Sequence, residues 1–266
     1  MRIIGISIIA ILVSFSVLAA EVEDVKSRGE TTRLLVEKSD NPSFTVVLFA
    51  GGKGVMDISE SGNIGWGSGN FLVRTRQLFQ SYGAITAVID APTDVRGKLH
   101  DFRRTEDHAK DVGAVIKHLR AKYGLPVWLV GTSRGTNSVA NAGLRLKQDR
   151  PDGIVLTSTM LAGSWANDYV TNMDIEKIEM PVLIVHHRKD DCVVTPADKV
   201  GDLREKLKYF QIPPARKEEV SERTHFSDFR EIHQRKTRFP APSRKEIELP
   251  KSGSIRENTL FRFQRN

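Results

Sequence analysis

Short, continuously apolar runs alternate with helix-forming segments along most of this chain, and this alternation constrains the fold more than any other feature. Such runs indicate strands that are covered on both faces, because a strand with one wet face alternates apolar and polar residues. Strands that alternate with helices favour a mostly parallel central sheet with helices on both faces. We therefore predict an α/β fold with three layers, αβα. The predicted strands are residues 31–38, 44–49, 84–89, 127–130, 154–156 and 182–185.

The segments between these strands have helical spacing. The predicted helices span residues 71–82, 105–123, 136–146 and 196–207. Gly83 and Gly124 follow the first two, and glycine adopts the left-handed conformation that closes a helix without a steric penalty. We assign these elements to one domain over residues 21–225. Residues 226–266 are expected to form a basic C-terminal tail that is disordered or atypical.

The first twenty residues resemble a secretory signal peptide. Arg2 supplies a positive charge, residues 3–18 are almost continuously apolar, and small residues follow at Ala19 and Ala20. A basic start, an apolar centre and a small-residue cleavage site are typical of exported proteins. The apolar run is shorter than the roughly 20 residues of a membrane span, although an uncleaved anchor is the alternative. We expect cleavage near Ala19 or Ala20, a periplasmic or secreted product, and no stable membrane span.

The positive charge of the chain is concentrated at its C-terminal end. Residues 211–266 contain 13 Lys and Arg against 8 Asp and Glu, and so carry +5 of the net charge of +7. The rest of the chain carries only +2, without a basic patch interleaved with aromatic residues. Nucleic-acid recognition usually requires such a patch. We therefore predict no nucleic-acid partner.

The motif Gly131-Thr132-Ser133-Arg134-Gly135 lies between a predicted strand and a predicted helix. A serine hydroxyl is a poor nucleophile at neutral pH, so it needs a general base and an exposed position. A tight turn from strand to helix exposes the serine, and the flanking glycines lack Cβ atoms that would clash in such a bend. The motif therefore predicts that Ser133 is a catalytic nucleophile.

A glycine-rich loop at residues 50–54 directly follows a predicted buried strand. Attack on a carbonyl group builds negative charge on its oxygen, which backbone N–H groups stabilise where the chain can approach closely. Glycines permit that approach. We expect the N–H of Arg134 to be one donor of an oxyanion hole and the N–H of Gly52 or Lys53 to be the other.

Together, the serine motif and the glycine-rich loop resemble the α/β-hydrolase superfamily, over about residues 31–207. In that family the chain order is oxyanion strand, nucleophile, acid and histidine. The resemblance assigns the acid to Asp190, in the turn after residues 182–185, with Val193 as the valine that follows three residues later. Asp191 is the alternative. The acid would orient the catalytic histidine and stabilise its cation.

The resemblance also implies a histidine near the end of the domain. His225 follows a predicted strand at residues 216–220 and would be the general base, with His233 as a second option. His186 and His187 end the strand before the acid and fit a structural role better. The family usually has a glycine beside its histidine and an amphipathic helix beyond it, and both are missing here. This departure leaves room for a damaged triad.

Several polar residues follow predicted strands at the edge where ligands bind in open α/β sheets. Asn70 with Arg74, and Asp90 with Asp94, could orient a substrate; hydrogen bonds within the scaffold are the alternative for all four. The single cysteine, Cys192, is predicted to be a small buried residue beside the acid turn. Because no residues have metal-ligand spacing and no phosphate-binding glycine motif occurs, we predict no metal and no cofactor.

The sequence as a whole predicts an exported serine hydrolase. It would cleave a carboxylic ester, or less readily an amide or thioester, through an acyl-enzyme on Ser133. Its partner would be a small-molecule ester or acyl compound, and its oligomeric state stays open. The alternative is a catalytically inactive binding protein on the same fold, with a degenerate histidine region.

Overall fold

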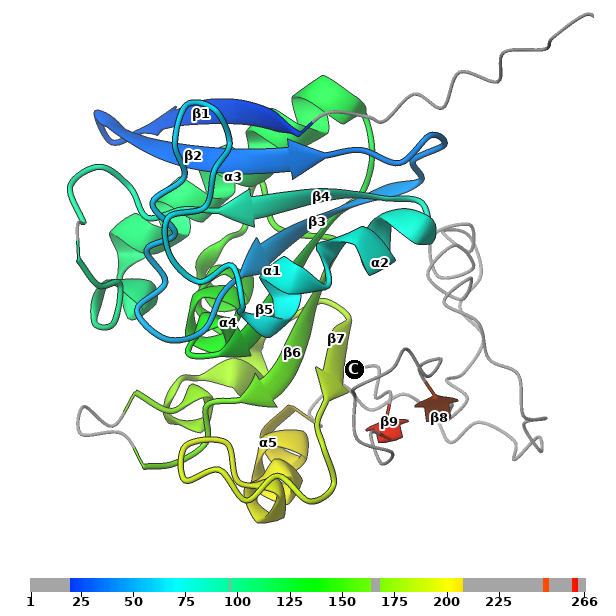
Figure 1. The fold of residues 1–266 in the computed structure, drawn as a ribbon. Coiled ribbons are helices and arrows are strands. Elements are labelled where there is room, and N and C mark those ends of the chain that lie inside the picture. The colour runs from blue at the N-terminus through cyan, green and yellow to red at the C-terminus, as the bar shows by residue number, and fades with distance from the viewer. Residues whose placement is uncertain (1–19, 96, 164–167, 208–245, 249–259, 263–266) are drawn as a thin grey trace, which may run out of the picture.

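The computed structural model describes residues 20–95, 97–163 and 168–207, together with the backbone of residues 246–248 and 260–262. One sheet contains β1 (Glu21–Ser27), β2 (Glu30–Glu37), β3 (Phe44–Phe49), β4 (Ala84–Ile89), β5 (Val127–Ser133), β6 (Gly153–Thr159) and β7 (Val182–Val185). Its strand order is β1-β2-β4-β3-β5-β6-β7 (Figure 1). The five strands from β4 to β7 in this order run parallel, whereas β1 and β2 form an antiparallel edge.

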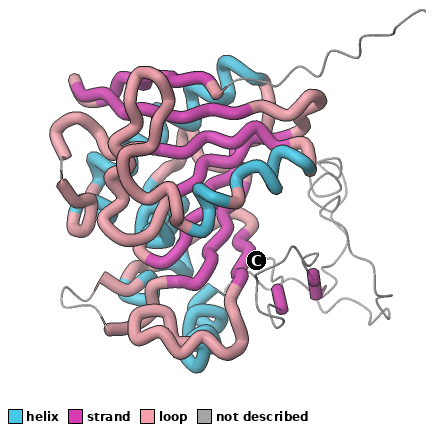
Figure 2. The backbone as a smooth tube through the Cα atoms, in the orientation of Figure 1, coloured by secondary structure: helices cyan, strands magenta, loops and turns pink. Residues whose placement is uncertain are grey.

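Helices cover both faces of this sheet (Figure 2). The described helices are α1 (Phe71–Arg74), α2 (Arg76–Ser81), α3 (Glu106–Tyr123), α4 (Gly135–Arg145) and α5 (Val200–Lys206). Val47 and Phe49 of β3 pack in one core with α3, α4 and α5, while Val46 and Leu48 pack in a second core with α1. The predicted three-layer αβα fold is therefore confirmed.

The central strands are buried on both faces, as their apolar runs predict. All six residues of β3 and all six of β4 are buried. Complete burial of one large apolar side chain stabilises the folded state by roughly 1.5–3 kcal/mol. The sheet is therefore a rigid platform, and the carboxyl ends of its parallel strands meet along one edge.

The hairpin of β1 and β2 includes a strand, β1, that was not predicted from the sequence. Its turn has two residues, Arg28 and Gly29, with φ values of 54° and 87°. Positive φ at both positions is favoured in two-residue hairpins. The apolar pattern of β1 is hidden because Glu23 points inward beside Val25 and is only 6% exposed.

Two predicted helices differ in detail from the structure. The helix predicted at residues 71–82 is divided at Thr75, whose Oγ1 donates a hydrogen bond to the Phe71 carbonyl at 2.6 Å. Such a bond competes with the helical backbone pattern and can bend a helix. The segment predicted at residues 196–207 starts with the 3₁₀ turn η4 (Ala197–Lys199), and α5 follows it. The remaining strands and helices agree with the prediction to within a few residues.

Some predictions fall on residues that the structure does not describe. They include the signal peptide as far as Ala19, the strand at residues 216–220, and most of the tail. Within the tail, the backbone of β8 (Glu246–Glu248) pairs antiparallel with that of β9 (Leu260–Arg262). No helix in the described part of the chain is long and apolar enough to span a membrane.

Candidate active site

Ser133 lies at a sharp bend between β5 and α4 (Figure 1). Its φ is +50°, in the left-handed region that side-chain-bearing residues seldom adopt. A residue held there costs roughly 1–3 kcal/mol, which the surrounding structure must offset. Thr136 helps to hold the bend, since its Oγ1 donates to the Ser133 carbonyl at 2.5 Å. The predicted strand-to-helix turn at this serine is present.

Two glycines make this bend possible. A Cβ atom on Gly131 would lie 2.6 Å from the carbonyl oxygen of Gly135, and a Cβ on Gly135 would overlap the carbonyl oxygen of Phe49. Neither backbone group can move without displacing a strand or a helix. The absence of these Cβ atoms therefore brings the start of α4 directly against the end of β3.

The glycine-rich loop after β3 lies against the serine. A Cβ on Gly51 would be 3.1 Å from the Cβ of Ser133, and Gly52 has a left-handed φ of +61°. The backbone N–H groups of Gly52, Lys53 and Arg134 form no hydrogen bonds with other described residues. N–H groups that are free beside a nucleophile can donate to a developing oxyanion.

A buried arginine supports this loop from behind. Arg103 belongs to the 3₁₀ turn η1 (Phe102–Arg104) and is 1% exposed. Its Nη1 donates to Ser138 Oγ in α4 at 2.8 Å, and its Nη2 donates to the Ala50 carbonyl at 2.9 Å. A Cβ on Gly54 would overlap Nη2. One guanidinium therefore ties the loop to the helix that follows the nucleophile.

Arg103 stays charged at neutral pH despite its burial. Burial lowers its pKa to about 9, with a further contribution from the charge of Arg134 and an opposing one from Asp168. The sequence did not point to this residue, because an arginine before a helix is ordinarily exposed. The one hint in the sequence is Gly54, whose missing Cβ leaves the space that the guanidinium of Arg103 fills.

A second unpredicted contact involves the side chain of Arg134. Its Nη1 lies 3.0 and 2.7 Å from the two ring nitrogens of His100. Burial lowers the pKa of His100, and the charges of Arg134, Lys98 and Arg103 lower it further, against an opposing effect of Asp101. The ring is therefore neutral at neutral pH, and one of its nitrogens can accept a hydrogen bond from the guanidinium.

The two predicted substrate-binding residues lie in different environments. Asn70 caps α1, where its Oδ1 accepts from the Leu72 N–H at 3.3 Å. Its Nδ2 faces the glycine-rich loop at residues 50–54, since a Cβ on Gly51 would be 3.7 Å from it. Arg74 is exposed, with its guanidinium carbon 5.9 Å from the centre of the Phe71 ring. The structure therefore places Asn70 beside the loop and Arg74 on the outer side of α1.

Asp90 and Asp94 serve the scaffold. The carboxylate of Asp90 accepts from the N–H groups of Met56 and Ile58 at 2.7 and 2.8 Å. Asp94 forms an ion pair with Arg28 at 3.0 Å. Both carboxylates therefore already have partners that fix the chain.

The carboxylate of Asp190 is held by the turn that follows β7. It accepts from the N–H of Cys192 at 3.2 Å and from Thr195 Oγ1 at 3.1 Å. His186 Nε2 is 3.5 Å from the carboxylate and donates to the Thr195 carbonyl at 2.9 Å. Burial lowers the pKa of His186, although Thr195 and Asp190 oppose this shift. Asp191 is exposed, whereas these donors hold the carboxylate of Asp190 in place, which favours Asp190 of the two candidate acids.

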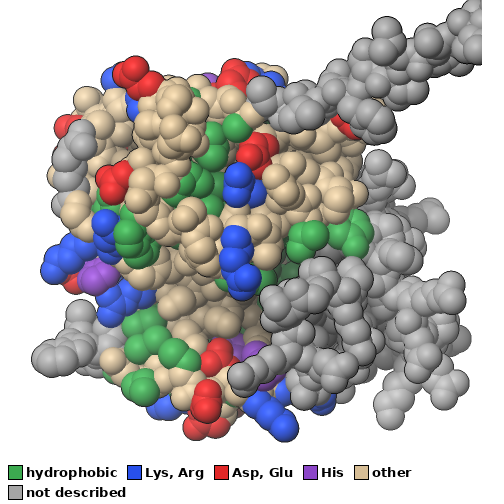
Figure 3. Space-filling view, in the orientation of Figure 1, with side chains coloured by type: hydrophobic (Ala, Val, Ile, Leu, Met, Phe, Trp, Pro, Cys, Tyr) green, Lys and Arg blue, Asp and Glu red, His purple; other side chains and the backbone are tan. Residues whose placement is uncertain are grey.

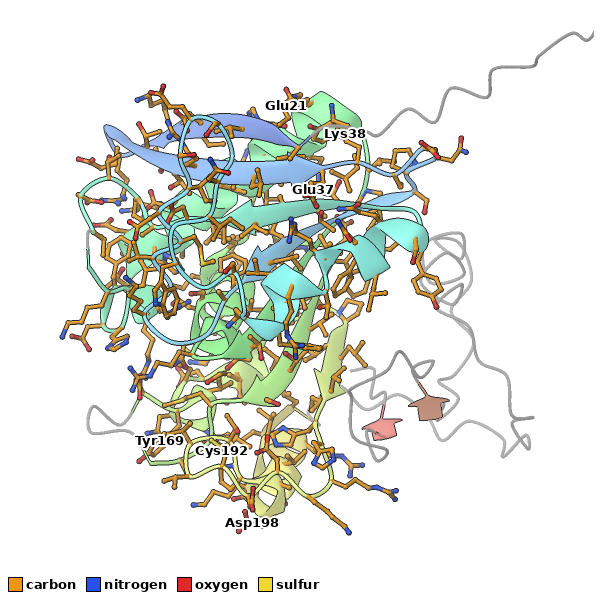
Figure 4. The ribbon with its side chains drawn as sticks, viewed as in Figure 1. Glu21, Glu37, Lys38, Tyr169, Cys192 and Asp198 are labelled. Atoms are coloured by element: carbon orange, nitrogen blue, oxygen red, sulfur yellow. The ribbon has the colours of Figure 1, made fainter. Side chains whose placement is uncertain are left out.

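The prediction that Cys192 is buried is wrong. Its thiol is exposed, on the loop beyond β7 (Figure 4). The turn uses the backbone N–H of this residue to bind Asp190, which leaves the side chain on the outside.

The predicted general base, His225, and the second option, His233, both lie outside the described residues. Among the residues that are described, no side chain forms a hydrogen bond with Ser133 Oγ. In the same part of the chain, no group of three or more His, Cys, Asp or Glu side chains is placed to hold a metal ion.

Comparison with solved structures shows the same architecture in several hydrolases. A serine hydrolase homologue from Coxiella burnetii has a TM-score of 0.50 and 14% identity, over 73% of this chain and 83% of that one. A serine hydrolase without lid from Xanthomonas campestris has a TM-score of 0.51 and 16% identity, over 71% and 79%. A cold-adapted esterase from an Arctic intertidal metagenomic library has a TM-score of 0.50 and 17% identity, over 70% and 78%.

These likenesses establish the fold: the chain has the α/β-hydrolase fold. In sequence comparisons, no protein-family model and no curated protein matches it. Since a fold supports many activities, the function must be argued from the site.

Proposed function

We propose that this protein is a serine hydrolase that cleaves a carboxylic ester through an acyl-enzyme on Ser133. The observation that carries the proposal is the strained backbone of Ser133, with a φ of +50°. Strain of this kind persists where the surrounding structure enforces it, and it is concentrated at functional sites. The backbone N–H groups of Gly52 and Lys53, which have no acceptor among the described residues, add support. So does the naming of structurally similar proteins as serine hydrolases and an esterase.

In the proposed mechanism, Ser133 Oγ attacks the ester carbonyl while His225 accepts the serine proton. The oxyanion accepts hydrogen bonds from the N–H of Arg134 and from that of Gly52 or Lys53. His225 then protonates the departing alcohol, and a water molecule deprotonated by the same histidine releases the acid. Asp190 keeps the imidazole in the tautomer that accepts the proton.

We also propose that the mature protein is exported. Residues 1–20 have the order of a secretory signal, and β1 begins at Glu21. Cleavage after Ala19 or Ala20 therefore leaves β1 intact. Intact-mass measurement of the protein recovered from the exported fraction tests this: a mature chain starting at Ala20 or Glu21 is expected, and a retained leader would contradict it.

The catalytic proposal is tested with a fluorophosphonate probe and p-nitrophenyl acetate. Ser133→Ala is expected to abolish labelling and to lower turnover by roughly 10⁴-fold or more. His225→Ala is expected to do the same, whereas Ser81→Ala, at an exposed serine in α2, is expected to change neither. A folded wild-type protein that neither labels nor turns over the ester would refute the enzyme.

The two candidate acids provide a matched pair. Asp190→Asn is expected to reduce turnover by up to roughly 10⁴-fold, because the amide favours the wrong histidine tautomer. Asp191→Asn removes an exposed carboxylate of the same size one residue later and is expected to have little effect. The reverse order would transfer the role of the acid to Asp191.

The rival function is a binding protein that has lost its catalytic histidine. The absence of a family-like glycine beside His225 favours it. It predicts that the folded wild-type protein binds an ester without consuming it, and that Ser133→Ala binds the same ester equally well. Replacement of His225 or His233 would then change neither the affinity for the ester nor its rate of hydrolysis.

A further inference from the structure

Basic side chains without carboxylate partners surround the Ser133 bend. Among the described residues, no carboxylate lies within ion-pair distance of Lys53, Lys98, Arg103 or Arg134. Figure 3 shows Lys and Arg side chains gathered around a histidine at the left of the molecule. Cations without an ion pair also occur elsewhere in the described chain, so these four are distinguished by their position around the Ser133 bend.

Contacts around the loop at residues 50–54 connect two of these cations to the site. The N–H of Leu99 donates to the Lys53 carbonyl at 2.8 Å and holds the segment around Lys98 against the loop. Lys53 Nζ lies 5.0 Å from the centre of the Trp66 ring. A Cβ on Gly52 would be 2.9 Å from the same ring. Lys53 and Lys98 therefore lie beside the oxyanion-hole loop, and together with Arg103 and Arg134 they form the rim of the site.

The contact between Arg134 and His100 fixes a cation without neutralising it. A carboxylate in place of His100 would hold the guanidinium and cancel its charge. The neutral ring accepts a hydrogen bond from Nη1, and the remaining donors of the guanidinium have no acceptor among the described residues. Because Arg134 directly follows Ser133, this charge is attached to the nucleophile bend itself.

The charge balance of the rim is positive. Arg134, Lys98 and Arg103 lower the pKa of His100 against Asp101, and Arg134 lowers the pKa of Arg103 against Asp168. Gathered charges of one sign raise the local concentration of a substrate of the opposite sign. A planar guanidinium also matches the geometry of a carboxylate or phosphate group.

We propose that the substrate of this site is an ester that carries a carboxylate or phosphate group, and that Arg134 and Lys98 bind this group while Ser133 attacks the ester carbonyl. This inference rests on the proposed function, because it names the substrate class of the same serine. It leaves open whether the anionic group is on the acyl side or on the alcohol side of the ester.

Two pairs of esters test the proposal on both sides of the scissile bond. Monomethyl glutarate is compared with methyl valerate, and 4-acetoxybenzoate with its methyl ester. In at least one pair, kcat/KM is expected to be roughly 10-fold or more higher for the anionic member at low ionic strength. The preference is expected to shrink as salt screens the charges. Equal or lower kcat/KM for the anionic member of both pairs would overturn the proposal.

Charge variants locate the preference. Lys98→Gln, and Lys98→Gln combined with Arg134→Met, are expected to reduce the ratio of anionic to neutral kcat/KM stepwise toward one. Lys38→Gln removes the same charge at the opposite edge of the sheet, where Lys38 pairs with Glu21 (Figure 4). It is expected to leave the ratio unchanged. A preference that survives in the double variant would contradict binding by these two residues.

A binding measurement separates this proposal from the catalytic one. Calorimetry with Ser133→Ala uses the full chain and needs no turnover. This variant is expected to bind the preferred anionic ester at least roughly 10-fold more tightly than its neutral partner. If that holds while the wild type hydrolyses nothing, the catalytic proposal fails and anion recognition stands. If the wild type hydrolyses neutral esters and both affinities are equal, anion recognition fails and the hydrolase stands.

Discussion

Charged residues are arranged differently at the two edges of the central sheet. At the edge where β1 meets α3, Glu23 is 5% exposed at its side chain and accepts from Tyr123, His118 and Lys122. Glu21 pairs with Lys38 and Lys122 at the same edge (Figure 4). At the edge that contains Ser133, Lys53, Lys98 and Arg134 have no carboxylate within ion-pair distance among the described residues, and the backbone of Ser133 is strained.

The difference indicates that the β1 edge stabilises the fold, whereas the surroundings of Ser133 are suited to binding and catalysis. Glu21 and Glu23 at the β1 edge both accept hydrogen bonds from side chains. A buried carboxylate without such donors would lower the free energy of unfolding. Around Ser133, three cations lack ion-pair partners and three backbone N–H groups lack acceptors among the described residues, and the left-handed conformation of the serine costs stability. Such costs are expected where a ligand or a transition state supplies the missing partner. Substitutions at the two edges should therefore affect different properties.

The largest expected effect comes from Gly135→Ala. Its new Cβ would overlap the Phe49 carbonyl oxygen, so β3 or α4 must move. We expect the free energy of unfolding to fall by about 3 kcal/mol and turnover to fall with it. Gly201→Ala in α5, where nothing lies within 4 Å of the new Cβ, is the control and should gain roughly 0.5–1 kcal/mol. Denaturant unfolding measures both, and equal stabilities would contradict the close packing at the bend.

Arg103→Met is expected to have the next largest effect. It removes the hydrogen bonds to Ala50 and Ser138, which should cost about 2 kcal/mol of stability. A loosened loop should also reduce kcat by roughly 10- to 100-fold in the folded variant, measured well below its unfolding temperature. Arg103→Lys keeps the charge without the planar fork, so it should restore kcat only in part.

Arg120→Met is the matched control for this substitution. Its Nη2 also donates to a carbonyl and to a side chain, those of Arg150 and Asp152, both at 2.8 Å. Its side chain is 36% exposed, so at most about 1 kcal/mol should be lost and kcat should not change. If Arg103→Met lowered stability but left kcat intact, the arginine would be structural only.

Glu23→Gln should change stability but not turnover. Burial alone would raise the pKa of Glu23, but hydrogen bonds from Tyr123, His118 and Lys122 outweigh it and lower the pKa below 4.5. A carboxylate with a lowered folded pKa contributes stability above its unfolded pKa, and this contribution is lost as the pH falls through the folded pKa. The variant should lose about 1–2 kcal/mol at pH 7 and depend less on pH below 4.5.

Asp198→Asn is the control, since Asp198 has no ion-pair partner among the described residues (Figure 4). Its pH dependence should match that of the wild type. Urea unfolding at several pH values measures all three proteins. A Glu23→Gln variant with the wild-type pH profile would show that the β1 edge is not stabilised by this carboxylate.

The smallest expected effect is that of Cys192→Ser. Because the thiol is exposed and only the backbone of Cys192 binds Asp190, stability should change by less than about 0.5 kcal/mol. A thiol reagent should label the folded wild-type protein stoichiometrically without lowering turnover. Protection of the thiol until unfolding would restore the original expectation that it is buried.

The sequence was sufficient for the parts of the structure that depend on local patterns. Continuous apolar runs located the central strands, and glycines at positions 131 and 135 located the serine bend. β1 was missed because Glu23 occupies a buried position whose partners, His118 and Tyr123, are distant in the chain. Local apolar spacing contains no information about such pairing.

The candidate site was predictable only where it depends on backbone turns. Ser133, the loop at residues 50–54 and the turn of Asp190 each have a short sequence signature. Arg103 and His100 have none, since their contacts with Ala50 and Arg134 depend on the tertiary fold. The same reasoning explains Cys192, whose outward direction is set by the hydrogen bonds around Asp190 rather than by its apolar character.

The most direct test of the account is to map the site of phosphonylation in the folded full-length mature chain. The protein is treated with a fluorophosphonate, digested, and analysed by tandem mass spectrometry, with a heat-unfolded sample in parallel. We predict one adduct, on Ser133, that forms only in the folded protein. A folded protein without an adduct, or with its adduct on another serine, would contradict Ser133 as the nucleophile.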